Sequence, residues 1–142
     1  TSGRVNHKTW DDYGTNLVRL GNAGVRQSAT EFVYSLDDYD PSYWGGTNPW
    51  AAIQAAFDDP ETDALYFLSD GKPSSDRRGG GWSRRDESST ATYYSNQNTG
   101  RPVNLKVHTT ALGLESNWME ELAEQTGGAY NQVDVTSLEE AG

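Results

Sequence analysis

The stretch LYFLSDGKPSS, residues 65–75, decides the fold. Its first four residues and the preceding Ala64 form a continuous apolar run, residues 64–68. Such a run is typical of a strand buried on both faces of a parallel sheet. The run then ends abruptly in Ser69-Asp70-Gly71. Because glycine tolerates backbone angles that other residues avoid, the chain can turn sharply there. We therefore expect a buried strand over residues 64–68 that leads into a polar loop carrying the Asp70 carboxylate.

Length and composition narrow the class of protein. The 142 residues fit one domain, which we divide into an irregular arm over 1–21, a helix and strand core over 22–135 and a tail over 136–142. With 11 Lys and Arg against 21 Asp and Glu, the net charge is −10, which argues against nucleic acid and suits metal cations or basic partners. There is no cysteine, so disulfides and thiolate metal sites are excluded. No apolar stretch is long enough to span a membrane.

Two amphipathic helices are predicted before the decisive strand. In residues 22–37, apolar side chains from Val25 to Leu36 recur at steps of about three and four, and Asn22 can cap the first turn. Residues 49–57, PWAAIQAAF, predict a second helix with Pro49 as its first residue and Asn48 or Thr47 as its cap.

After the strand, helical and strand patterns alternate. We expect a glycine-rich loop over 71–87, a weak helix over 88–97 and a strand over 103–112. A helix anchored by Trp118 and ended by Gly127-Gly128 follows, and then a strand over 129–135. Residues 137–142 predict one more helical start or a frayed end. Strands that alternate with helices pair in parallel, so the fold class is α/β.

Thr47 and Asp70 are the candidate metal ligands. In an open parallel sheet the binding crevice lies at the carboxyl ends of the strands, where Asp70 stands, and the segment before the second helix can reach the same rim. A hydroxyl and a carboxylate are oxygen ligands of the kind that Mg²⁺ selects. Two such groups make an incomplete site, which a ligand carboxylate or another protein segment could finish. The structural alternatives are a helix cap for Thr47 and a loop cap for Asp70.

Several segments together resemble the von Willebrand factor A domain family, in the family's own order from about residue 10 to residue 135: GGTNPWAAIQAAF, LYFLSDGKPS, VNLKVHTTALG and WMEELAEQTGGAYNQV. The resemblance implies a Rossmann-like three-layer α/β fold, with a mainly parallel sheet flanked by helices. It also implies that Thr47 and Asp70 are parts of a metal-ion-dependent adhesion site. The expected ion is Mg²⁺, with Ca²⁺ or Mn²⁺ as alternatives.

The sequence departs from that family in its amino-terminal part. The family's first metal element, Asp-x-Ser-x-Ser at the end of its first strand, does not occur here, and the amino-terminal strands have no counterpart. Three explanations are open: the chain is part of a longer polypeptide, a partner chain supplies the strands, or the domain has lost the metal site and kept the scaffold. We favour the first two. An open parallel edge invites another strand, so we expect the isolated chain to be unstable without a complementing segment.

These observations predict a protein-binding module for adhesion or assembly rather than an enzyme. The expected partner is a protein that contributes an acidic side chain or a complementing strand. The alternative is a metal-free structural subunit that complements another chain's sheet. An extracellular or cell-surface location is favoured over the cytoplasm. His108, inside a predicted strand, is interpreted as a partly buried imidazole with a hydrogen-bond partner and not as a base.

Two charged segments complete the candidates. The loop RRGGGWSRR, residues 77–85, is interpreted as a flexible insertion. It could instead hold a phosphate or an acidic patch, and its place on the rim makes it our first choice for partner contact. Asp37, Asp38 and Asp40 lack the alternating ligands of a calcium loop and predict a solvated turn.

Overall fold

The computed structural model describes Trp10, Val18, Arg19 and the segments 21–35, 47–134 and 136. The chain forms two compact units, residues 3–45 and residues 46–142, and each is described by itself. The predictions for most of the amino-terminal arm, for the acidic turn before the second helix and for the last helical start lie outside the described residues. That the chain is a single domain stays a prediction.

The first unit contains helix α1 (Ala23–Tyr34). As predicted, Asn22 caps it, and its side-chain oxygen accepts a hydrogen bond from the Gly24 N–H at 2.8 Å. On the helix, Val25 is buried while Val33 is 60 % exposed, so the apolar side chains of this helix are not all covered within the described part of the chain.

The second unit is an α/β layer structure. Its elements in chain order are α2 (Trp50–Asp58), β1 (Ala64–Ser69), α3 (Arg84–Gln97), a 3-10 turn η3 (Asn98–Gly100), β2 (Lys106–Leu112), α4 (Asn117–Thr126) and β3 (Tyr130–Val133). The strands form one sheet in the order β1-β2-β3, and both pairings are parallel. The α/β class and the parallel sheet are thus confirmed.

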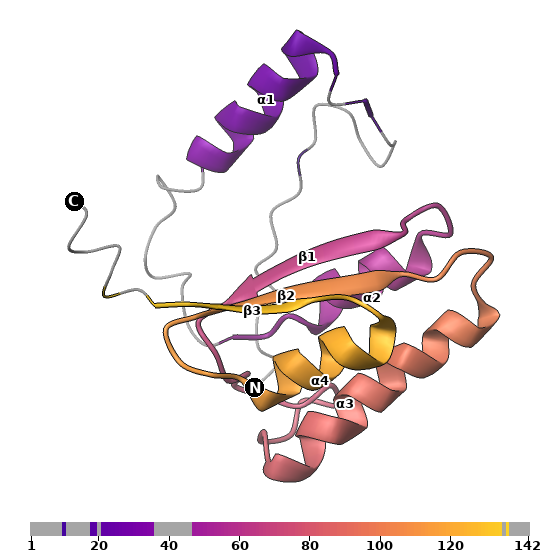
Figure 1. Cartoon of the computed structure of the whole chain (residues 1–142), viewed down its shortest axis with the longest axis vertical. Helices are drawn as coiled ribbons and strands as arrows, with labels where there is room; N and C mark the ends of the chain where they lie inside the picture. Colours follow the sequence, from indigo (N-terminus) through magenta and orange to yellow (C-terminus); the bar gives the residue numbers. More distant parts are fainter. Residues whose placement is uncertain (1–9, 11–17, 20, 36–46, 135, 137–142) are drawn as a thin grey trace. The chain divides into compact units, whose positions relative to one another are not determined.

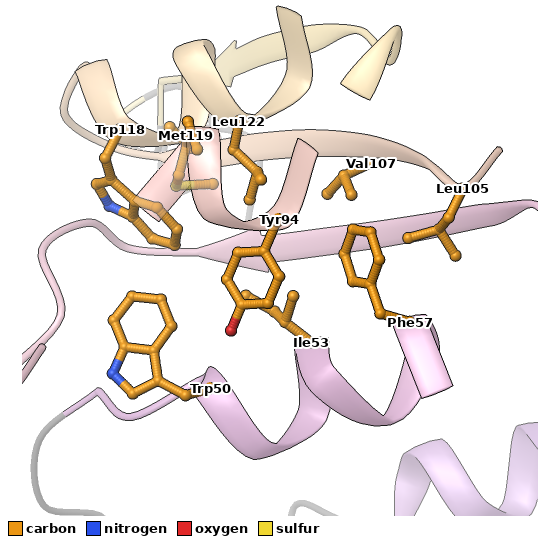
Figure 2. Packing of buried hydrophobic residues seen from close by; sticks show 11 residues of the cluster. Trp50, Ile53, Phe57, Tyr94, Leu105, Val107, Trp118, Met119 and Leu122 are labelled. Atoms are coloured by element: carbon orange, nitrogen blue, oxygen red, sulfur yellow. The ribbon is translucent and has the colours of Figure 1, made fainter. Parts of the chain in front are cut away.

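Helices α2, α3 and α4 all pack on one side of the sheet (Figure 1). Ile53, Tyr94 and Leu122, one from each helix, are almost completely buried there and belong to the same hydrophobic cluster as Val107 of β2 (Figure 2). Burial of apolar side chains is the main stabilising term in such a core. The second unit therefore has a hydrophobic core of its own on this face.

The opposite face of the sheet is open within residues 47–134. Tyr66 and Leu68 of β1 are 72 % and 61 % exposed, and Thr110 and Leu112 of β2 are only half-buried. The prediction that residues 64–68 form a strand is confirmed, but the prediction that this strand is buried on both faces is wrong. The reason is that the described helices cover one face only, so a second helical layer stays a prediction.

The starts of two elements differ from the sequence predictions by three residues or more. Helix α3 begins at Arg84 and not at residue 88, because Ser83 and Asp86 form a capping box that starts the helix earlier. Strand β2 begins at Lys106 and not at residue 103. Just before it, the Asn98 side chain bonds both the N–H and the C=O of Leu105, at 2.9 and 3.0 Å, and thereby replaces a strand partner.

Helix α4 ends as predicted at the glycine pair. Gly127 has a φ of 78°, a left-handed conformation that favours glycine at the end of a helix. None of the helices in the described segments has the length and apolar character that a bilayer span requires.

Candidate functional site

Asp70 lies at the carboxyl end of β1, where the strand turns into a loop. Gly71 follows with a φ of 141°, a backbone conformation that side-chain-bearing residues rarely adopt. The Gly71 N–H donates to the Ser69 hydroxyl at 3.3 Å, so the turn is closed immediately around Asp70. The carboxylate itself is exposed. This is the strand-end position that the sequence predicted.

Thr47 is tied to the same loop by two backbone contacts. Its N–H donates to the Ser74 hydroxyl at 2.8 Å, and the Ser74 N–H donates to the Thr47 carbonyl at 2.8 Å. The segment before α2 and the loop after β1 therefore run side by side. The predicted capping role is wrong: the N-cap of α2 is Pro49, which has no side-chain cap bond, and the helix begins at Trp50.

Two tryptophans hold the loop that carries Asp70. The indole N–H of Trp50 donates to the Ser75 carbonyl at 2.9 Å, and that of Trp118 donates to the Gly71 carbonyl at 3.2 Å. Trp50 and Trp118 come from α2 and α4 and contact each other with ring centroids 5.7 Å apart. Because both anchors are buried, the loop is tied to the hydrophobic core of the unit.

The two candidate ligands make no competing interaction among the described residues. Neither the Thr47 hydroxyl nor the Asp70 carboxylate takes part in a side-chain hydrogen bond or ion pair there. No group of three or more Asp, Glu, His or Cys side chains is gathered for a metal ion in the segments that the structure describes. A cation at this rim would thus need further oxygen atoms from a ligand, a partner or water. The roles of Thr47 and Asp70 as metal ligands stay predictions.

The arginine-containing loop is compact rather than extended. Asp76 accepts hydrogen bonds from the N–H groups of Arg78 and Gly80, at 2.8 and 2.7 Å, and closes a tight turn. Arg77 lies over the Tyr93 ring, 3.5 Å from its centroid. Trp82 then returns to the core and stacks on Trp50 at 5.6 Å. The described conformation does not support the interpretation of this loop as a flexible insertion.

Two side chains with shifted pKa values, Asp86 and Tyr94, lie in a different element from Thr47 and Asp70. The Ser83 hydroxyl and N–H both donate to Asp86, at 2.6 and 2.7 Å, and lower the pKa of that carboxyl. Burial raises the pKa of Tyr94 to about 12, against an opposing effect of the Arg77 charge. Both groups belong to α3, so these shifts report on its cap and its packing.

The prediction that His108 is a partly buried imidazole with a hydrogen-bond partner is confirmed. It lies in β2, is half-buried and stacks on Tyr66 with ring centroids 4.9 Å apart. Its Nδ1 accepts a hydrogen bond from the Ala129 N–H at 3.1 Å. The imidazole therefore links β2 to Ala129, the residue before β3.

Sequence reasoning missed the residues that hold the site together. Ser74 and the two indole N–H groups were given no role, although Ser74 and Ser75 follow Asp70 closely in the sequence. A buried indole N–H usually finds an acceptor, as those of Trp50 and Trp118 do. The N–H of Trp82 is buried without a partner among the described residues, so a tryptophan in the sequence does not by itself reveal such a contact.

The chain matches no protein-family model, and no curated protein or solved structure is significantly similar to it. The resemblance to the von Willebrand factor A family therefore rests on the motifs quoted above.

Proposed function

We propose that this chain is a protein-binding module, for adhesion or assembly, whose ligand contact lies at the carboxyl rim of the sheet. Thr47 and Asp70 contribute two oxygen ligands to a divalent-cation site there, with Mg²⁺ as the expected ion and Ca²⁺ or Mn²⁺ as alternatives. The observation that carries the proposal is the reciprocal hydrogen bonding of Thr47 with Ser74, which joins both ligand-bearing segments.

A cation held by only two protein oxygens keeps positions for other ligands. Hard divalent cations bind six or more oxygens and accept carboxylates readily. The amino-terminal end of α2 begins at this rim, and the partial positive charge of a helix start favours an incoming anion. An acidic side chain of a partner would then complete the coordination, so that metal and partner bind together.

The open face of the sheet favours a second candidate function. A parallel sheet is normally covered on both faces, yet Tyr66 and Leu68 are largely exposed. In this alternative the chain is a metal-free structural subunit whose sheet joins another sheet. Partner binding would then be equal in Mg²⁺ and in EDTA.

Site-resolved NMR with Mn²⁺ tests the metal proposal. Paramagnetic Mn²⁺ replaces Mg²⁺ at oxygen sites and broadens the signals of nearby amides. With substoichiometric Mn²⁺, the amides of Gly71 and Asn48 should broaden first, and excess Mg²⁺ should reverse the effect. Asp70→Ala should abolish it, with a loss of affinity of about tenfold or more, because a charge-bearing ligand is removed.

The matched control is Asp63→Ala. Asp63 is also exposed but precedes β1, at the opposite end of the strand. This variant should bind Mn²⁺ at the rim like the parent chain. Broadening that is spread over the acidic surface and survives Asp70→Ala would refute the site.

A further inference from the structure

The two edges of the sheet are built differently. The Lys106 N–H donates to the Asp63 carbonyl at 2.9 Å, which sets the alternation of hydrogen bonds between β1 and β2. In parallel pairing, every second residue bonds to one neighbour. Ala64, Tyr66 and Leu68 therefore direct their N–H and C=O groups away from β2. Among the described residues, no strand pairs with β1 on that side.

The β1 edge lacks the features that protect a free edge. Natural edge strands are short, charged, bulged or interrupted by proline. Strand β1, ALYFLS, has no charge and no proline, and its register with β2 is continuous. Strand β3 at the other edge is shorter, and two of its residues, Asn131 and Gln132, are exposed amides. By this comparison β3 is a true edge, whereas β1 has the sequence of an interior strand.

Chain topology points to the same side. Helix α2 precedes β1 and packs on the face that also holds α3 and α4. Crossovers between parallel strands are right-handed in nearly all proteins. A strand that entered β1 through α2 would therefore lie beyond the free side of β1 and not beyond β3.

We propose that the free edge of β1 binds a parallel β-strand from outside residues 1–142. Such a strand would be apolar on both faces, since its neighbour β1 is. The described part of the chain does not hold a second strand of that kind, and before Thr47 the longest apolar run, Phe32-Val33-Tyr34, lies in α1. The inference deepens the structural alternative given above and does not depend on a metal.

Disulfide trapping in EDTA tests the edge and its direction. The chain has no cysteine, so Leu68→Cys introduces a single thiol on β1. The probe is a synthetic peptide with the sequence ALYFLS flanked by lysines, with one cysteine at either its carboxyl or its amino end. A glutathione redox buffer is present, and its oxidised form takes up the two electrons and two protons that are released when the two thiols form a disulfide. Parallel pairing brings the carboxyl end beside residue 68. The carboxyl-cysteine peptide should therefore react at least about tenfold faster, because pairing raises the local thiol concentration.

Two controls separate pairing from random collision. The same peptide with proline in place of its phenylalanine should lose the advantage, and Asn131→Cys on β3 should react equally with both peptides. Far-UV circular dichroism of each variant checks that the chain is folded.

Each other outcome overturns the proposal. Equal rates at Leu68→Cys mean that the edge does not pair. A faster amino-cysteine peptide means antiparallel pairing, and a disulfide-linked dimer of the chain that forms ahead of the peptide adduct assigns the edge to a second copy. Because EDTA is present throughout, none of these results bears on the Mn²⁺ site.

Discussion

The two faces of one small sheet differ in what covers them more than in their residues. Thr109 and Thr110 are consecutive in β2. Thr109 is completely buried and its hydroxyl donates to the Met119 carbonyl of α4 at 2.8 Å, whereas Thr110 is half-buried on the open face. Likewise Leu122 of α4, which packs on the covered face, is fully buried, whereas Leu68 of β1 on the open face is 61 % exposed. The difference teaches that the covered face holds the second unit together, whereas within residues 47–134 nothing covers the open face.

The largest expected effect on the free energy of unfolding is a difference between substitutions of Leu122 and Leu68. Leu122→Ala removes apolar contacts from the core and leaves a cavity, so it should lower the free energy of unfolding by about 2–5 kcal/mol. Leu68→Ala should change it by less than about 1 kcal/mol, as exposed substitutions do. Urea unfolding followed by circular dichroism measures both. Equal losses for the two variants would mean that the open face is covered in solution.

A smaller effect is expected at the neighbouring threonines. Thr109→Val keeps the shape but removes the hydroxyl that bonds α4, and should lower the free energy of unfolding by about 0.5–1.5 kcal/mol. Thr110→Val should stay within about 0.5 kcal/mol of the parent. Urea unfolding followed by circular dichroism measures the free energies of both variants. A greater loss at Thr110 would reverse the assignment of the faces.

The smallest expected effect on the free energy of unfolding near neutral pH is at Tyr94, which is buried on the covered face of the sheet. Burial raises its pKa from 10.0 to about 12, so the folded chain favours the neutral phenol. The stability that this provides is complete below pH 10 and is lost as the pH rises toward 12. Tyr94→Phe cannot ionise and should lose less stability over this range. Urea midpoints of parent and variant across the range measure the difference, and parallel losses in the two proteins would contradict it.

The elements of the second unit were largely predictable because their signals are local. Apolar residues at helical spacing marked α2 and α4, and a continuous apolar run marked β1. The errors arose where a side chain took the place of a backbone partner, as Asn98 does at Leu105. Such a bond links residues through the fold and leaves no periodic pattern. The start of α3 was a different case, since Ser83 and Asp86 have the spacing of a capping box.

Prediction of the candidate site was limited for a similar reason. Strand-end chemistry placed Asp70 on the rim, and the hydrogen bonds to Ser74 bring the Thr47 segment to the same loop. What no spacing in the sequence could show is that Trp50 and Trp118 hold the loop by their indole N–H groups, because those contacts require the packing of α2 and α4 against each other. Burial on both faces was mispredicted because an apolar strand does not reveal which layers cover it.

The tryptophan cluster has an optical consequence. Trp50, Trp82 and Trp118 lie with ring centroids 5.6 to 5.7 Å apart, close enough for their electronic transitions to couple. The near-ultraviolet dichroism of the chain should therefore contain a signature of their mutual orientation. The indole N–H groups of Trp50 and Trp118 also bond to backbone carbonyls of the loop that follows Asp70. An ion or a partner that shifts this segment would therefore change the near-ultraviolet dichroism, and no attached dye would be needed to detect it.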